Sequence, residues 1–438
     1  MLELSLILLL GLMAGIIVGL LPGLPQYVGL LMLYPLIQYM SIEQIMVFWL
    51  ACQIGSQYFG SVAAILLKIP GEASSIIFLE DIDKIKTPDR YDLIRQTAWG
   101  STVASLVSLG LLLFVYYIGL SEHLLVLTNI NTKMIVLTIL MLTLIYFTKS
   151  RWIAALMFFG GLAVAPKSNH ELPNWVWHMQ DVTTDVTVFS LLLGAMIIPE
   201  FLKELQSKLK GDSVLDLKDN KKRSRLDFKS MFKGTWLGSL IGFIPGPSAI
   251  LASIITYNSH KDKSKIKERI ISSESANNSA AVSSMLPFLF VGLPITLSEM
   301  ILSDIMAVKT FVLPLDLKGE TVLPGVNYIE FCFLLVMFLT VSYHFLAQSF
   351  LKYYEKLMMF AHGKLLWVYI ALVIYLVTID TMFNPVYMPR YLLFMALMTW
   401  GGIWLLKRQI SVLPLIFGFV LGDMITWAVY NFYRINFY

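Results

Sequence analysis

Charged residues are scarce in this chain. Asp, Glu, Lys and Arg make up 14% of its 438 residues, whereas 57% of the residues are hydrophobic. A soluble domain carries about 25% charged residues, so too few polar side chains remain here to cover a globule of this size. This excludes a soluble enzyme, a soluble nucleic-acid binder and a disordered chain. The apolar runs are long and unbroken, and the composition therefore predicts an all-α polytopic membrane protein.

Residues that build catalytic and metal sites are also few. The two cysteines, Cys52 and Cys332, lie in apolar runs, which predicts neither a disulfide nor a metal site. The chain has no phosphate-binding Gly-Lys-Ser/Thr loop and no His-Glu-x-x-His motif. An acidic group at 80–83 resembles a metal motif, but it stands alone beside two lysines and is better interpreted as a solvated loop. We therefore expect no catalytic residue, no metal and no cofactor.

Basic residues are absent from the first part of the chain and cluster later. Lys68 is the first Lys or Arg, ten basic residues lie in 203–233, and five more lie in 261–269. Such clusters are retained on the cytoplasmic side of a membrane. Acidic residues interleave with the first cluster, so nucleic acid is not an expected partner. The pattern predicts a multi-pass protein of the inner cell membrane, surrounded by lipid.

Hydrophobic stretches long enough to span a bilayer, at about 20 residues each, recur along the chain. They lie near 2–21, 24–40, 44–67, 97–120, 133–148, 151–165, 186–202, 329–350, 364–379, 389–406 and 411–430. Two further apolar regions, 234–257 and 279–313, are interrupted by Gly and Pro. The spanning-length rule predicts about 10 to 13 membrane segments in total.

Two rows of glycine at four-residue spacing indicate an internal repeat. Both rows end in Pro-Gly, and the second follows the first at an offset of 223 residues. The rows are Gly11, Gly15, Gly19 and Pro22-Gly23, and Gly234, Gly238, Gly242 and Pro245-Gly246. A second landmark, Ile69-Pro70-Gly71 and then Gly292-Leu293-Pro294, recurs at an offset of 224. We interpret 1–205 and 234–438 as two transmembrane repeats, joined by a basic cytoplasmic loop at 206–233.

Loop charge predicts that the two repeats are inverted. The loop 261–269 is basic, whereas its counterpart at about 37–46 has no basic residue. After the second landmark the bias reverses, since 81–95 carries four basic residues and 305–325 carries two. Opposite charge bias at matching positions is what inverted-topology repeats produce.

The segment 234–257 has two interpretations. If the basic clusters on both sides of it are cytoplasmic, it enters the bilayer and returns as a re-entrant hairpin, but a single kinked crossing also fits its length. In either case Pro245-Gly246, like Pro22-Gly23, opens the backbone at membrane depth, because Pro lacks an N–H and Gly tolerates the turn that follows. Paired breaks in two halves indicate a transporter's binding site, whereas the upstream glycines are typical of close helix packing.

Several motifs resemble, in order, those of one membrane-protein family. Gly-x-x-x-Gly-x-x-Pro-Gly at 15–23, Tyr-Phe-Gly-Ser at 58–61 and Ile-Pro-Gly-Glu at 69–72 are similar to the large permease subunit of tripartite tricarboxylate transporters, the TctA family. The second half adds Gly-Phe-Ile-Pro-Gly at 242–246 and Glu-x-x-Asn-Asn at 274–278. A Leu-Pro-Leu-Ile-Phe-Gly motif near the C-terminus extends the resemblance over nearly the whole chain. The Glu-x-x-Asn-Asn element is its most specific part.

This resemblance implies a permease that works with a small membrane subunit and a periplasmic substrate-binding protein. Its substrates are expected to be organic anions, di- or tricarboxylates, moved by alternating access in symport with Na⁺ or H⁺. The chain is shorter than typical members, and Lys68 stands where the family has an uncharged polar residue; these departures concern the substrate more than the fold. Two alternatives remain, an integral-membrane enzyme acting on a lipid-linked substrate and a channel or scaffold.

Two polar features allow both a purely structural and a functional interpretation. Glu274, Asn277 and Asn278 share a helix face and form either an N-terminal cap at the membrane surface or, as the resemblance implies, a site for a cation or a carboxylate. Lys68 either reaches the interface with its long side chain or faces an anionic substrate. Ser74 and Ser75 are expected to cap a half-helix whose N–H groups face an anion.

The expected substrate site gathers residues from both repeats. Those of the first repeat are Pro22, Gly23, Gly60, Ser61, Lys68, Pro70, Gly71, Ser74 and Ser75. Those of the second are Pro245, Gly246, Ser248, Glu274, Asn277, Asn278, Pro294 and Thr296.

Overall fold

A computed structural model of the chain describes most of its helices. It describes residues 2–21, 26–37, 39–67, 73–82, 84–118, 139, 142–143, 145–146, 150–164, 188–199, 202, 224–244, 248–292, 294–308, 321–362, 365–383, 388–408, 410, 412, 414–419 and 422. The chain divides into two compact units. Unit 1 is Met1–Ser121 with Gly211–Leu365, and unit 2 is Glu122–Lys210 with Leu366–Tyr438.

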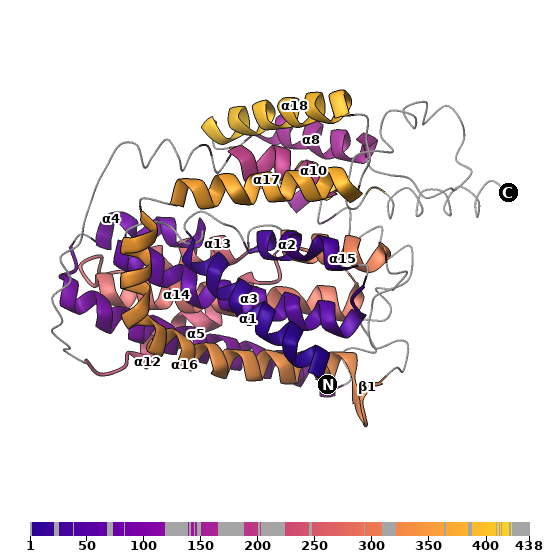
Figure 1. Cartoon of the computed structure of the whole chain (residues 1–438). Coiled ribbons are helices and arrows are strands. Elements are labelled where there is room, and N and C mark those ends of the chain that lie inside the picture. Colours follow the sequence, from indigo (N-terminus) through magenta and orange to yellow (C-terminus); the bar gives the residue numbers. More distant parts are fainter. Residues whose placement is uncertain are drawn as a thin grey trace. The chain divides into compact units, whose positions relative to one another are not determined.

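Unit 1 is built from two similar series of helices, one from each half of the chain (Figure 1). The first series is α1 (Leu2–Leu20), α2 (Tyr27–Ile37), α3 (Ile42–Leu67), the 3-10 helix η1 (Ala73–Phe78), α4 (Leu79–Ile82) and α5 (Thr87–Tyr117). The second is α12 (Phe228–Ile241), α13 (Ser248–Asn258), α14 (Ile266–Val291), α15 (Leu297–Val308) and α16 (Tyr328–His362). A short antiparallel hairpin of β1 (Thr321–Leu323) and β2 (Val326–Asn327) precedes α16. The expectation of an all-helical architecture is confirmed, apart from this hairpin.

Each glycine row packs its helix against one partner. A Cβ on Gly15 would lie 2.8 Å from the carbonyl oxygen of Ala51 in α3, and a Cβ on Gly238 would lie 2.3 Å from that of Ala276 in α14. The remaining members, Gly11, Gly19, Gly234 and Gly242, meet the same two helices within 2.8 Å. A larger side chain would force these helices apart, so the prediction that the upstream glycines serve helix packing is confirmed.

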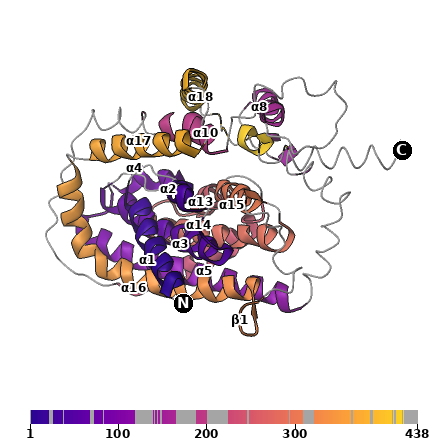
Figure 2. The same ribbon diagram turned by 45° about the vertical axis from the view of Figure 1, so that its right-hand side comes forward.

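Contacts between the two series are reciprocal (Figures 1 and 2). Within each series the glycine-row helix packs on the long helix, α1 on α3 and α12 on α14. Between the series, η1 packs on α13 while α15 packs on α2, and α5 packs on α14 while α16 packs on α3. Equivalent helices of the two halves therefore make equivalent contacts with the other half.

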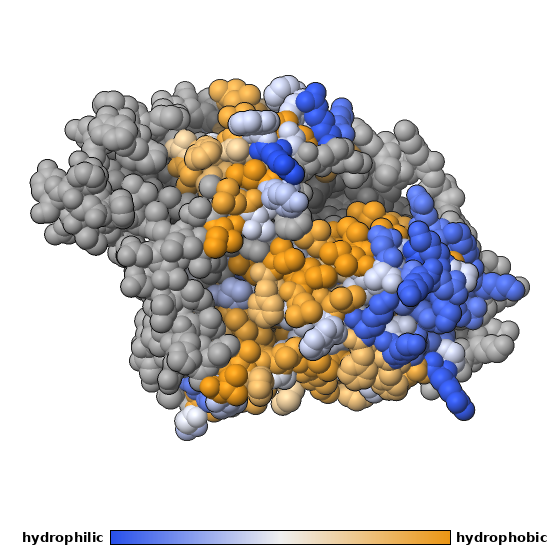
Figure 3. Space-filling model, turned by 180° about the vertical axis from the view of Figure 1, so that it is seen from behind, coloured by the Kyte–Doolittle hydropathy of each residue, from blue (hydrophilic) through white to orange (hydrophobic). Residues whose placement is uncertain are grey.

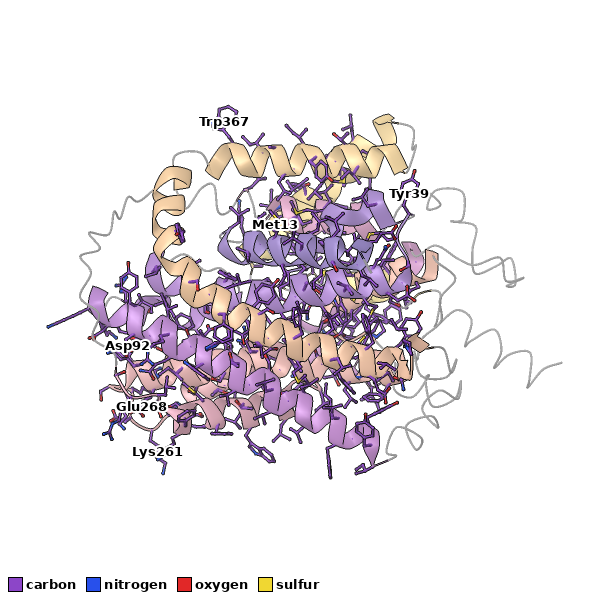
Figure 4. The ribbon with its side chains drawn as sticks, turned by 60° about the horizontal axis from the view of Figure 1, so that its bottom comes forward. Met13, Tyr39, Asp92, Lys261, Glu268 and Trp367 are labelled. Carbon is purple, nitrogen blue, oxygen red and sulfur yellow. The ribbon has the colours of Figure 1, made fainter. Side chains whose placement is uncertain are left out.

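One end of unit 1 gathers charged residues from three parts of the chain. Ser224, which precedes α12, donates its backbone N–H to Asp92 of α5 at 3.2 Å, and Lys267 of α14 pairs with Asp89 at 3.2 Å. Tyr257, near the end of α13, donates to Asp81. We call residues 81–95, 224–227 and 257–269 the charged end. Figure 4 shows Asp92, Glu268 and Lys261 there, and Figure 3 shows hydrophilic residues gathered beside a hydrophobic flank.

The hairpin interpretation of 234–257 agrees with this arrangement. α12 begins at the charged end and α13 ends there, so the chain enters unit 1 and returns to the same end. The Asp227 side chain accepts the Ser230 N–H at 3.1 Å and so caps α12, which begins at Phe228. The helical part of the second half thus starts before 234, inside the stretch expected to be a connecting loop.

The other end of unit 1 joins different segments. Tyr328, at the start of α16, donates to Glu43 at the start of α3 at 2.5 Å, and Asn327 donates to Tyr116, near the end of α5, at 2.7 Å. Gln44 also donates to Glu3 at 3.3 Å. We call residues 3, 41–44, 116–117 and 327–330 the opposite end. It follows that α3 and α14 run in opposite directions, and so do α5 and α16.

Two helical stretches of the described chain, Asp89–Tyr117 and Tyr328–Ala347, are long and apolar enough to cross a membrane. Shorter apolar helices include Glu3–Gly19, Arg151–Ala163 and Ser248–Asn258. The number of crossings stays a prediction.

Unit 2 consists of helices from both halves of the chain. It holds α8 (Arg151–Val164), α10 (Val188–Leu192), the π-helical turn η4 (Leu193–Ile197), α17 (Leu365–Phe383), α18 (Met388–Lys407) and a helical stretch at 414–419. Glycine again sets the packing, because a Cβ on Gly161 would lie 2.1 Å from the Leu415 carbonyl oxygen and one on Gly402 would lie 2.3 Å from that of Ala195.

Candidate functional site

A run of polar residues in α14 is buried from end to end. Nine side chains are at most 1% exposed: Ser272, Ser273, Glu274, Ser275, Asn277, Asn278, Ser279, Ser283 and Ser284. α14 begins at Ile266, after Lys265, so Glu274 and both asparagines lie well inside the helix. Their interpretation as an N-terminal cap is therefore wrong. Buried polar groups call for hydrogen bonds, water or a ligand, and the role of this element as a site stays a prediction.

Asn278 links α14 to α5. Its Nδ2 donates to Ser101 Oγ and to the Glu274 carbonyl oxygen, both at 2.9 Å. Its Oδ1 has no hydrogen-bond partner among the described residues. One residue along α5, Thr102 shares a 2.8 Å hydrogen bond with Tyr58 of α3. Adjacent residues of α5 thus contact polar side chains of both α3 and α14.

A triangle of hydroxyl groups holds three helices together nearby. Ser108 of α5 lies 3.0 Å from Ser239 of α12 and 2.7 Å from Ser279 of α14, and the latter two are 2.7 Å apart. Since these hydroxyls satisfy one another, their role is to join helices rather than to bind a ligand.

The predicted residues of the first half that the structure describes lie on α3 and η1. Gly60 and Ser61 are buried in α3, and Ser61 Oγ donates within the helix to the Tyr58 carbonyl oxygen at 3.2 Å. Ser74 and Ser75 are buried in η1, which packs against α3, α13 and α14. The helix expected to begin at Ser74 is a six-residue 3-10 segment followed by the four-residue α-helix α4. It is therefore too short to present a substantial dipole to an anion.

The second half places its remaining described residues at two points. Ser248 is buried at the start of α13, and its Oγ has no hydrogen-bond partner in the described part of the chain. Pro294 and Thr296 precede α15. Seven predicted site residues lie outside the described residues, and their roles stay predictions: Pro22, Gly23, Lys68, Pro70, Gly71, Pro245 and Gly246.

Glu299 is a buried acidic residue that the sequence analysis did not single out. It is 0% exposed, and its Oε2 accepts the backbone N–H groups of Ile295 at 2.8 Å and Thr296 at 3.0 Å. Ser284 of α14 contacts its Oε1 at 3.2 Å. The signal was available, since Thr-x-x-Glu at 296–299 precedes an apolar run and is a capping-box pattern.

The charged end is held by an ionic cluster around Asp81. Arg269, 8% exposed, lies 3.3 Å from Asp81 and stacks on the Tyr257 ring, its guanidinium carbon 3.8 Å from the ring centre. Partial burial alone would raise the pKa of Asp81, but hydrogen bonds from Lys84 and Tyr257 and the charges of Lys84 and Arg269 outweigh it and lower that pKa. Asp81 therefore acts as an ion-pair partner between the two halves. In the described residues, no group of three or more His, Cys, Asp or Glu side chains could hold a metal ion.

These features define the class of the protein, a helical protein of two reciprocally packed halves around a buried polar interior. The chain belongs to the Tripartite tricarboxylate transporter TctA family, whose profile matches residues 6–417. Proteins of this family are membrane-bound transporter components, and the resemblance in the motifs is confirmed.

One curated relative and the solved structures complete the comparison. A protein of Agrobacterium vitis, described as an uncharacterized 52.8 kDa protein in the TAR-I ttuC' 3' region, is 27% identical over 300 residues. The match covers 65% of this chain and 60% of that relative. No solved structure matches the chain.

Proposed function

We propose that this chain is the permease subunit of a tripartite transporter in the inner cell membrane, where it moves di- or tricarboxylates by cation-coupled symport and alternating access. The observation that carries the proposal is the buried Glu-x-x-Asn-Asn element of α14, enclosed by both halves of a chain of this family. Polar residues at membrane depth are costly and tend to be functional.

Inverted repeats supply the framework for alternating access. The opposite directions of α3 and α14, and of α5 and α16, together with the reciprocal contacts, support a two-fold axis in the membrane plane. The opposite end carries Glu3, Glu43 and Glu330, whereas basic residues populate the charged end, which the positive-inside rule assigns to the cytoplasm. At about 21 Å and 16 Å, α12 and α13 are shorter than the roughly 30 Å hydrocarbon core and fit a re-entrant hairpin.

The substrate is expected near Pro22-Gly23 and Pro245-Gly246, which lie outside the described residues and which the sequence predicts to open the backbone. In this proposal Asn277 and Asn278 of α14 contribute polar groups to the site, and Lys68 would supply the positive charge that an anion needs. A small membrane subunit and a periplasmic substrate-binding protein would act with the chain, as the family name implies.

Of the two coupling ions, a proton fits the surroundings of Glu299 better than Na⁺. α2, α3 and α15 carry no basic residue, and the basic residues of α14, Lys267 and Arg269, pair with aspartates at the charged end. The other titratable side chains on these elements are Tyr27 and Tyr34 of α2, Glu43, Cys52 and Tyr58 of α3, Glu268 and Glu274 of α14 and Asp304 of α15. None of these carries a positive charge that could neutralise a buried carboxylate.

The hydroxyl proton of Ser284 provides a further reason. Its Oγ lies 2.9 Å from the Ala281 carbonyl oxygen and 3.2 Å from Glu299 Oε1, but a hydroxyl has one proton to donate. If Ser284 donates that proton to the Ala281 carbonyl oxygen, a hydrogen bond between Ser284 Oγ and Glu299 Oε1 requires a proton on the Glu299 carboxyl group. Two backbone N–H groups already donate to Oε2, so this oxygen is poorly placed to coordinate a metal cation.

Uptake measurements test the proposal. The tagged chain, purified from its own membranes with any subunits that remain bound, is placed in proteoliposomes, and uptake of labelled tri-, di- and monocarboxylates is followed with a Na⁺ or a pH gradient. Saturable, gradient-dependent carboxylate uptake is expected. Gradient-independent leakage would favour a channel, and conversion of a lipid-linked substrate would favour an enzyme.

Variants locate the site within this assay. Asn277→Ala should abolish uptake and leave folding intact, whereas Asn258→Ala, at the exposed end of α13, should transport normally. Lys68→Gln should weaken substrate binding. Glu299→Gln, which keeps the cap because Gln also suits a capping box, should lose proton-driven accumulation but retain substrate exchange. Glu80→Gln, exposed in α4, is its control.

A further inference from the structure

A stripe of polar side chains on α3 has unsatisfied hydrogen-bonding groups in the interior of unit 1. Trp49, Gln53 and Gln57 are 1%, 4% and 1% exposed. Trp49 Nε1, Gln53 Oε1 and Gln57 Nε2 have no hydrogen-bond partner among the described residues. Each such group costs about 1–3 kcal/mol when it is buried without a partner. Three of them on one helix therefore call for an explanation.

These three residues lie on one face of α3, and at Trp49 this face contacts α14. They are four residues apart, so their side chains line up along the helix at intervals of about 6 Å. The Trp49 ring packs edge-on against Phe288 of α14 with the ring centres 5.8 Å apart. Next to Gln57, Tyr58 bonds to Thr102 of α5, the neighbour of the residue that Asn278 contacts. The stripe thus lies near the polar element of α14.

The stripe is also the counterpart of that element in the repeat. Gly19 packs against Ser56 and Phe59 of α3, and Gly242 packs against Ala280 and Ser283 of α14, which aligns α3 with α14 at an offset of 224 residues. At this offset Gln53 matches Asn277, and Trp49 matches Ser273. This is the offset at which the second landmark, Ile69-Pro70-Gly71 and then Gly292-Leu293-Pro294, recurs in the sequence.

We infer that Trp49, Gln53 and Gln57 form a second substrate-binding face, which together with the α14 element takes a hydroxylated di- or tricarboxylate. This inference rests on the proposed transport function. The N–H groups of Trp49 and Gln57 are donors, which suit carboxylate oxygens, and Gln53 Oε1 is an acceptor, which suits a substrate hydroxyl group. Neutral donors on this face leave the charge of the anion to be balanced elsewhere, consistent with the absence of Lys and Arg from α3.

Conservative variants remove single groups while keeping the packing. Trp49→Phe deletes the indole N–H and keeps a ring against Phe288, and Gln53→Met and Gln57→Met replace an amide by an apolar chain of similar length. Removing an unpartnered buried polar group is neutral or stabilising. The ligand-free Gln53→Met and Gln57→Met variants should therefore melt at or above the wild-type temperature, whereas Trp49→Phe also leaves a small cavity, which lowers stability. A purely structural role for Gln53 and Gln57 would instead lower the melting temperature of their variants.

Binding to the purified full-length chain is measured with citrate and with propane-1,2,3-tricarboxylate, which lacks the hydroxyl group. Trp49→Phe and Gln57→Met should weaken the binding of both. Gln53→Met should reduce the preference for citrate over its deoxy analogue. Gln44→Met is the control, because Gln44 lies at the opposite end and bonds to Ser41 and Glu3. The variants should leave binding of a monocarboxylate closer to the wild-type value than binding of citrate.

The outcomes separate this inference from the proposed function. Unchanged citrate affinity in Gln57→Met, with unchanged or raised stability, would mean that ordered water satisfies the stripe, and would overturn the inference alone. An unchanged preference in Gln53→Met would overturn the assignment of the hydroxyl group. A wild-type chain that neither binds nor transports any carboxylate would overturn the proposed function itself.

Discussion

The helices α3 and α14 occupy equivalent places in unit 1 but differ in the polarity of their buried residues. Both are 26 residues long, and both receive a glycine-row helix. α14 buries a nearly continuous run of Ser, Asn and Glu, whereas α3 buries aromatic and aliphatic side chains with a narrow stripe of Trp and Gln. The comparison shows that the two halves share the packing of their helices, whereas they differ in the groups that they present to the interior.

The largest expected effect breaks the packing that the two helices share. Gly238→Val should destabilise the protein by more than about 3 kcal/mol, the upper part of the usual range for overpacked cores, because its side chain would collide with the α14 backbone. Gly15→Val should have a similar effect through α3. Melting temperatures in detergent measure both.

A matched control is available on α5. A Cβ on Gly110 meets no atom within 4 Å, so Gly110→Ala should stabilise the helix by about 0.5–1 kcal/mol. If Gly15→Val were tolerated and Gly238→Val were not, the two glycine rows would not be equivalent.

The two ends of unit 1 differ in their electrostatics, and a second variant tests that contrast. Asp81→Asn removes the carboxylate that pairs with the nearly buried Arg269 and should cost about 1–3 kcal/mol, as expected for hydrogen bonds to charged groups. Glu268→Gln removes an exposed pair with Lys265 and should change the melting temperature little. Equal effects of the two changes would contradict the idea that Asp81 joins the halves.

Two buried amides test the comparison of α14 with α3: the Asn278 Nδ2 group is hydrogen-bonded, whereas Gln57 Nε2 has no partner among the described residues. Asn278→Ala loses two hydrogen bonds and should lower stability by about 1 kcal/mol, while Ser101 still donates to the Thr97 carbonyl oxygen. Gln57→Met should not lower stability. Both should impair carboxylate transport, so thermal melting and uptake, measured on the same preparations, separate the two roles.

The smallest effect is a dependence of stability on pH at the charged end. The pKa of Asp81 is held below its ordinary value of 3.8, so its ionised form stabilises the folded protein above that pH. This stabilisation is lost as the pH falls through the lowered pKa. Between pH 6 and about pH 3 the wild-type melting temperature should therefore fall further than that of Asp81→Asn. If the melting temperatures of the two proteins fell in parallel with pH, Asp81 would not account for the pH dependence.

Much of the fold could be predicted because it depends on local pattern. Glycine at four-residue spacing predicts close helix packing, and Gly15 and Gly238 pack closely. The length and apolarity of the runs predict helices, and motifs such as Glu274-x-x-Asn277-Asn278 predict the family. The start of α12 at Phe228 was not predicted, because the basic composition of 206–233 indicated a loop. The helix nevertheless begins there, since the Asp227 side chain caps it.

The sequence by itself thus determined the helical class and the family, since the lengths of the apolar runs and the spacing of the motif residues indicate them. Only the tertiary structure decided that Glu274 and the asparagines lie inside a helix rather than at its cap, that 234–257 returns to the end where it began, and that Gln53 and Gln57 are buried. These properties depend on burial and on contacts such as Tyr257 with Asp81, which lie 176 residues apart in the chain. Local spacing carries no information about which distant side chain will satisfy, or fail to satisfy, a buried polar group.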